Sequence, residues 1–168
     1  MRTGTILRIL RHLILPDWWA LRPFSKATLR KIEQAISASE NTHLGELRFV
    51  VEATLPLHGL WHGQSARARA VELFSQLGVW DTEHNTGVLI YVQLIDRRVE
   101  IVADRGINAK VGDAFWSTVC RRIEGAFREG QFEEGTLLAL SAITDVLAEH
   151  FPATGDNPDE LPNAPLIA

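Results

Sequence analysis

Cysteine is almost absent from this chain of 168 residues, which contains a single one, Cys120. One cysteine excludes an intrachain disulfide and suits a reducing compartment. Because Cys120 falls within an amphipathic run, we interpret it as a small buried apolar residue rather than a reactive thiol.

Long apolar runs are also missing, and no segment has the length and apolarity that a transmembrane helix needs. The N-terminal stretch Met1–Leu15 is partly apolar, but Arg8, Arg11 and His12 interrupt the central region that a secretory signal requires. We therefore expect a cytoplasmic protein.

Positive charge is not in excess, since the formal net charge is −4. This balance argues against nucleic-acid binding, which usually requires a basic domain or a basic face. The chain also lacks a Gly-x-Ser-x-Gly elbow, a phosphate-binding glycine loop, a His-Glu-x-x-His motif and a Cys-x-x-Cys motif. These absences leave open whether the protein is an enzyme, and we predict no organic cofactor.

What is present is an ordinary globular composition, with 46% hydrophobic and 23% charged residues, which predicts one folded domain. We divide the chain into a basic amphipathic arm at 1–22, an α/β domain at 23–151 and an irregular tail at 152–168. The tail is rich in proline, asparagine and aspartate and shows no periodicity, so we expect it to pack loosely.

Hydrophobic periodicity predicts the element order α-β-α-β-β-α-α in the central domain. The expected helices cover 25–39, 65–77, 113–129 and 132–150, and the expected strands cover 47–53, 87–94 and 98–103. A helix joins the first two strands, which should therefore be parallel, whereas the short turn at 95–97 makes the last two an antiparallel hairpin. The predicted fold class is α/β, a three-layer α/β/α sandwich with a small mixed β-sheet.

The arm at 1–22 has apolar residues at roughly helical spacing and four arginines against one aspartate. One interpretation is an amphipathic helix that rests on an anionic membrane surface, so that residues 1–20 make a peripheral membrane contact. The other, which we favour, is a helix that folds back on the domain and buries the same apolar face.

Four segments together resemble the TPM domain family in order and spacing: Gly78–Ile90, Asp96–Val102, Asp104–Ile107 and Phe127–Gly135. The resemblance extends over about 25–151 and implies an α/β/α sandwich. Family members have been described as binding divalent metal, calcium in particular, and one plant branch as a weak acid phosphatase in photosystem repair. Long members carry a signal peptide and a C-terminal membrane helix, and this sequence shows neither pattern. We therefore expect this chain to represent a short cytoplasmic bacterial branch.

The predicted topology brings the start of the second strand to the end of the third. Asn85 and Asp104 should then share one edge of the sheet, with Asp81 in the loop that leads to it. Carboxylate and amide oxygens are the ligands that hard cations prefer. We therefore predict a site for calcium or another divalent cation, formed by Asp104 first, then Asn85 and Asp81. The alternative is that these residues only cap turns or face solvent.

Several further polar residues are expected near these strand ends. Four of them should point toward the same edge as Asp104: His43, Glu46, Glu83 and His84. The opposite edge collects Glu52, His58, His62, Asp96 and Glu134, which we rank second as a site because the two histidines follow a strand.

Three functions therefore remain open. The first is a cation-binding interaction or accessory module with a protein partner that the sequence does not identify. The second is a weak metal-dependent acid phosphatase, which rests on family analogy and would use metal-activated water. The third is a structural or assembly factor that binds no ligand.

Overall fold

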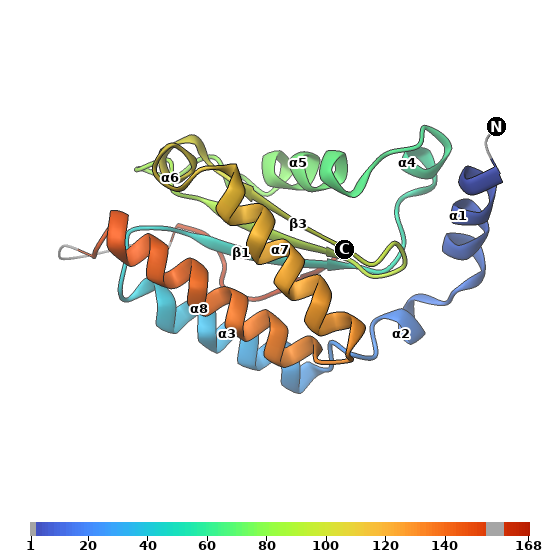
Figure 1. Cartoon of the computed structure of the whole chain (residues 1–168), viewed down its shortest axis with the longest axis horizontal. Coiled ribbons are helices and arrows are strands. Elements are labelled where there is room, and N and C mark those ends of the chain that lie inside the picture. Colours follow the sequence, from blue (N-terminus) through green and yellow to red (C-terminus); the bar gives the residue numbers. More distant parts are fainter. Residues whose placement is uncertain (1–2, 154–159) are drawn as a thin grey trace.

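The computed structural model describes residues 3–153 and 160–168. Its elements follow the chain as α1 (Thr3–Ile14), α2 (Asp17–Ala20), α3 (Lys26–Glu40), β1 (Leu47–Glu52), α4 (Leu57–Trp61), α5 (Ala66–Gln76), β2 (Val88–Gln93), β3 (Arg98–Ala103), α6 (Arg105–Val111), α7 (Asp113–Arg128), α8 (Phe132–His150) and β4 (Leu166–Ile167). Helices α3, α7 and α8 lie on one side of the sheet and α5 lies on the other (Figure 1).

The strands form one sheet in the order β3-β2-β1-β4. Strands β1 and β2 are parallel, with Leu47 opposite Val88, and β2 and β3 are antiparallel, with Val88 opposite Ala103. The predicted fold class, an α/β/α sandwich with a mixed sheet, is confirmed.

The two central strands are buried along their whole length. Phe49 and Ile90 belong to the larger core under α3, α7 and α8, whereas Val50 and Tyr91 belong to the smaller core under α5. Successive residues of a strand face opposite sides of a sheet, so strands covered on both faces need nearly continuous apolar sequence.

Helix α5 buries a face made largely of small residues. The apolar spacing in this segment predicts Val71, Phe74 and Leu77 as inward positions; Phe74 and Leu77 are partly buried against the smaller core, whereas Val71 is 48% exposed. The buried residues are instead Ala66, Ala70 and Leu73. Small alanine side chains let the helix axis approach the sheet closely, which places the larger residues at the flanks.

Helix α1 folds back on the domain, but it buries its polar side. The Arg8 guanidinium donates to both carboxylate oxygens of Asp96, and its two bonds to Oδ2 measure 2.9 and 2.7 Å. His12 Nδ1 accepts from the Leu55 backbone N–H at 3.1 Å, so its Nε2 carries the proton and donates to Asp96 Oδ1 at 3.2 Å. The expectation that the apolar face would be buried against the domain is therefore wrong, because Asp96 selects the polar face.

The sequence predicts an irregular chain after Pro152, but part of this segment forms a strand. Strand β4 pairs in parallel with β1, Val50 lying opposite Leu166. The Arg48 guanidinium donates to the carbonyl oxygens of Pro162 and Ala164, which ties this segment to the sheet edge. Periodicity cannot reveal a strand of two residues. Across the described residues, no helix combines the length and the apolarity that crossing a bilayer requires.

Candidate functional site

The predicted edge is held together by backbone hydrogen bonds between the loop before β2 and the end of β3. The Asp104 N–H donates to Gly87 O at 2.8 Å, and the Gly106 N–H donates to Asn85 O at 2.9 Å. A Cβ atom on Gly106 would lie 2.5 Å from Asn85 O and 2.6 Å from His84 O, so the close approach requires glycine here. The structure thus brings Asp104 and the Asn85 loop together.

Asp104 is the N-cap residue of helix α6, an element that the sequence pattern did not predict. Its Oδ1 accepts from the Arg105 N–H at 2.7 Å. Its Oδ2 is buried and has no hydrogen-bond partner. Buried carboxylate oxygens without a partner are rare, because each loses hydration without compensation.

Asn85 adopts a left-handed backbone conformation, with φ of 55°. Asparagine tolerates this region better than most residues. Its side-chain Oδ1 accepts from Arg105 Nε at 2.9 Å. The arginine therefore occupies the amide oxygen that a cation would use, a competition that spacing in the sequence did not reveal.

Asp81 lies in the turn that precedes the Asn85 loop, and its N–H donates to Gly78 O at 2.9 Å. Its side chain is exposed, as are those of Glu83 and His84. The Glu83 N–H donates to the Glu160 carboxylate at 3.2 Å. Of the three residues predicted for the site, Asn85 and Asp104 lie in two segments that backbone hydrogen bonds join, whereas Asp81 stays at the solvent-exposed approach.

His43 and Glu46 do not open onto this edge, because both are buried. His43 Nδ1 accepts from the Gly45 N–H at 3.1 Å, so the protonated Nε2 donates to Ser39 Oγ at 2.7 Å. A histidine that donates to a serine cannot remove its proton, so this pair is not a nucleophile with its base. Burial lowers the pKa of His43 to about 4, and the ring stays neutral at physiological pH.

The next question is whether the oxygen atoms at this edge suit a calcium ion. The described residues contain no group of three or more His, Cys, Asp or Glu side chains placed to hold a metal ion. A site built from one carboxylate, one amide oxygen and backbone carbonyls needs no such group, and Ca²⁺ accepts all three ligand types. The unpartnered Asp104 Oδ2 fits such an ion, whereas Arg105 must leave Asn85 Oδ1 before the ion can use it.

The opposite edge offers less to a ligand. The rings of His58 and His62 lie 4.2 Å apart and are exposed on and beside α4. Glu52 is buried, accepts from Arg69 Nη2 at 2.7 Å and also accepts from the Tyr91 hydroxyl. Asp96 is bound by α1, so these two carboxylates are engaged in holding the fold together.

Cys120 is half-buried against the larger core. Burial raises the pKa of its thiol to about 11, so the thiolate that a nucleophile needs is scarce at neutral pH. This agrees with a packing role.

Comparison with known proteins settles the family. The TPM domain profile matches residues 22–146, which is most of the chain. The chain belongs to the TPM domain family. The NMR structure of the BA42 protein from the psychrophilic bacterium Bizionia argentinensis is 32% identical, with a TM-score of 0.75, over 86% of this chain and 94% of that one.

A second solved structure supports the same fold for this TPM domain. The N-terminal domain of a protein from P. gingivalis is 23% identical, with a TM-score of 0.63, and the match covers 77% of this chain and 82% of that one. At this identity the likeness concerns the fold alone. No curated protein matches the sequence.

Proposed function

We propose that this TPM domain binds a divalent cation of the calcium type at the edge formed by Asp104 and the Asn85 loop, and that it acts as an interaction or accessory module. The observation that carries the proposal is the buried Asp104 Oδ2, which has no hydrogen-bond partner. A carboxylate oxygen in this position is stabilised by a cation far more than by solvent that it cannot reach.

Asp104 supplies the negative charge in this proposal, and the Asn85 amide supplies a neutral oxygen. Asp81, exposed at the approach, is a further ligand whose side chain reaches the ion only by turning inward. Because Arg105 holds Asn85 Oδ1, the ion must displace a positive charge as it binds. We therefore expect weak affinity, with a dissociation constant of about 10⁻⁴–10⁻³ M, as in extracellular calcium-binding modules.

Calorimetric titration with Ca²⁺, Mg²⁺ and Mn²⁺ tests the site in wild type, Asp104→Asn and Asp145→Asn. Asparagine caps a helix as well as aspartate does, so Asp104→Asn keeps α6 and removes only the charge. Asp145 is exposed on α8, which makes Asp145→Asn a control for the same change of net charge. We expect Asp104→Asn to weaken binding at least about tenfold and Asp145→Asn to leave it unchanged. Wild type that releases no heat at millimolar ion, or equal heat in both variants, would refute the proposal.

Variants at Asp104 also test the two alternative functions, a metal-dependent phosphatase and a ligand-free structural role. A metal-dependent phosphatase needs the same ion, so its turnover of a phosphate ester must disappear in Asp104→Asn. A ligand-free structural role predicts instead that no cation raises the thermal midpoint of wild type, while Asp104→Ala lowers that midpoint by removing the α6 cap.

A further inference from the structure

Helix α1 turns its polar side toward the domain and leaves its apolar side exposed. With Arg8 and His12 fixed on Asp96, the apolar stripe of the helix faces solvent. Its members recur at helical spacing on one face, and all are exposed: Ile6, Leu7, Leu10, Leu13 and Ile14. An apolar helix face left in water is costly and marks an interaction surface.

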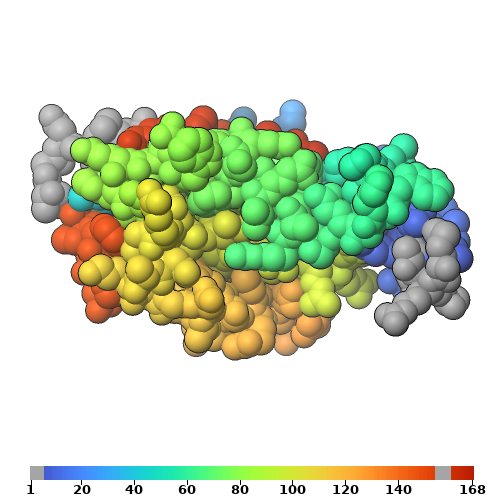
Figure 2. Space-filling view, turned by 90° about the horizontal axis from the view of Figure 1, so that it is seen from above, coloured from blue at the N-terminus to red at the C-terminus, as the bar shows by residue number. Residues whose placement is uncertain are grey.

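The apolar surface continues beyond α1. Trp18 and Trp19 in α2 are 68% and 51% exposed, and Leu57 and Trp61 in α4 are 59% and 66% exposed. Helices α1, α2 and α4 gather at one end of the molecule, opposite the end that carries α6 and the Asn85 loop (Figure 1). Seen from above, α4 and α1 lie together at that same end (Figure 2). Most of the exposed large hydrophobic side chains of the described residues therefore share one end.

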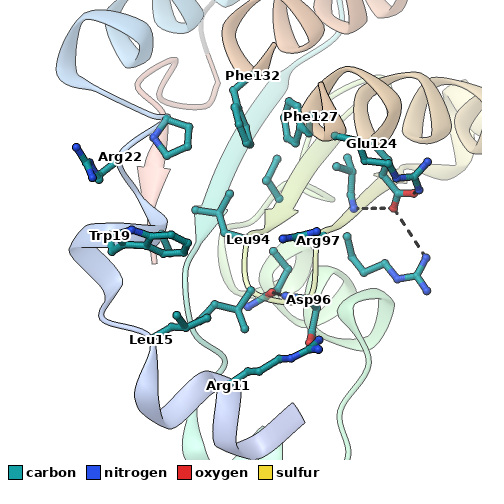
Figure 3. A pocket seen from close by; sticks show the side chains of 18 residues that line it. Arg11, Leu15, Trp19, Arg22, Leu94, Asp96, Arg97, Glu124, Phe127 and Phe132 are labelled. Atoms are coloured by element: carbon teal, nitrogen blue, oxygen red, sulfur yellow. Dashed lines mark hydrogen bonds and ion pairs between the residues drawn. The ribbon is translucent and has the colours of Figure 1, made fainter. Parts of the chain in front are cut away.

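A cavity of about 760 Å³ opens beside this surface, between the α1–α2 segment, the β2–β3 turn and the facing ends of α7 and α8 (Figure 3). Its apolar lining comes from elements far apart in the sequence and includes Leu15, Trp19, Leu94, Phe127 and Phe132. Arginine side chains complete the lining, so the cavity combines apolar walls with positive charge.

The charge at this end is positive although the chain as a whole carries −4. The two carboxylates of the cavity, Asp96 and Glu124, are each already paired with basic side chains. Within residues 3–153 and 160–168, no carboxylate forms an ion pair with Arg11, Arg22 or Arg97, all of which line the cavity. Three uncompensated cations are thus available to an anionic group.

We propose that the α1–α2 end docks peripherally on an anionic phospholipid surface. The apolar stripe enters the boundary between headgroups and acyl chains, Trp18 and Trp19 lie at the headgroup level that tryptophan prefers, and the arginines of the cavity bind lipid phosphates. Asp17, the single acidic residue of the arm, accepts from the Thr54 hydroxyl at 3.0 Å. The overall negative charge repels the rest of the molecule from such a surface, so the basic end alone sets the orientation.

A second copy of the chain is the competing occupant of this surface. A two-fold symmetric dimer would bring the same patch of each copy together. The arginines of both copies, Arg11 and Arg22 among them, would then be gathered in one interface, and like charges in an interface are costly. An anionic bilayer satisfies both the apolar stripe and the arginines.

Vesicle flotation tests the proposal on the full chain, with a chelator present so that the Asp104 edge plays no part. Wild type should float with vesicles of phosphatidylcholine and phosphatidylglycerol, less so as salt is raised, and should not float with phosphatidylcholine alone. Leu10→Gln and Leu13→Gln should each weaken binding about tenfold or more, whereas Leu138→Gln, at a 65% exposed position on α8, should not. Arg11→Gln and Arg22→Gln should each weaken it about fivefold, with Arg122→Gln as the charge control.

All of these positions are exposed, so an unchanged thermal midpoint confirms that each variant folds. Equal flotation with and without phosphatidylglycerol, or no flotation at all, overturns the proposal. A dimer in solution that Leu13→Gln dissociates, without vesicle binding, overturns it too and assigns the surface to a second copy. Asp104→Asn should bind vesicles like wild type, so this proposal and the cation site can fail separately.

Discussion

Arg105 Nε donates a 2.9 Å hydrogen bond to Asn85 Oδ1, and the backbone N–H of the same arginine donates to Asp104 Oδ1 at 2.7 Å. The guanidinium thus holds one of the oxygens that the proposed cation requires. A positive side chain and a positive ion compete for that oxygen, so the affinity of the site depends on how readily Arg105 leaves.

The first prediction follows from this competition. Arg105→Met keeps the aliphatic stem and removes the charge, so calcium affinity should rise about fivefold, the effect of one unit charge a few ångströms away in a solvated site. Calorimetric titration measures the change. Arg121→Met, at an exposed position of α7, serves as a control for net charge. Lower affinity in Arg105→Met would mean that the arginine supports the site.

The second prediction concerns the attachment of α1 to Asp96. Burial by itself would raise the pKa of Asp96, but the hydrogen bonds from His12 and Arg8 outweigh it and lower the pKa from 3.8 to about 2. A depressed folded pKa contributes stability that is present above the unfolded value and is lost as pH falls through the folded value.

Wild type should therefore exceed Asp96→Asn in free energy of unfolding by about 2 kcal/mol above pH ~4, and this difference should vanish as the pH falls toward ~2. Denaturant titration of both proteins across this range provides the measurement. A difference that stays constant down to pH ~2 would show that the carboxylate charge does not hold the helix.

The third prediction addresses the buried pair under α5. Arg69 Nη2 donates to Glu52 Oε1 at 2.7 Å, and Glu52 is 1% exposed. Arg69→Met leaves that carboxylate buried without its cation, which should cost about 3–5 kcal/mol in urea unfolding. The double variant Arg69→Met with Glu52→Gln should recover a good part of this loss, because the charge is gone as well. Equal losses in the single and double variants would contradict the explanation.

The fourth prediction compares two glycines. Gly106→Ala places a Cβ against the carbonyls of His84 and Asn85 and should destabilise by about 1–3 kcal/mol. Gly125 lies within α7, and a Cβ added there would meet nothing within 4 Å, so Gly125→Ala should stabilise by about 0.5–1 kcal/mol. Thermal and urea unfolding distinguish the two. Opposite signs are the essential result.

The sequence predicted the sheet well, because long apolar runs and short turns leave few alternatives. The strand expected at 98–103 matches β3, and the helix expected at 132–150 matches α8. Helix α6 was missed, since Gly106 in its first turn lowers helix propensity and Asp104 looked like a loop residue. The structure shows that Asp104 is the N-cap residue of this helix.

Side-chain direction was less predictable than topology. The apolar periodicity of α1 indicated a helix correctly but indicated the wrong buried face, because the deciding partner, Asp96, is distant in the sequence. The same holds for Arg105, whose contact with Asn85 depends on how two separate loops meet. Strand order thus predicts which residues share an edge, whereas the hydrogen bonds between them depend on side-chain directions that the sequence pattern does not specify. Cation binding itself stays a prediction.

Strand β4 has only two residues, yet with the Arg48 contacts it covers the free edge of β1. That edge would otherwise present unpaired amide and carbonyl groups from the centre of an apolar sheet, and such edges recruit strands from other molecules. The segment therefore occupies backbone groups of β1 that a strand from another molecule could otherwise use, and at two residues it is too short to offer a long edge of its own.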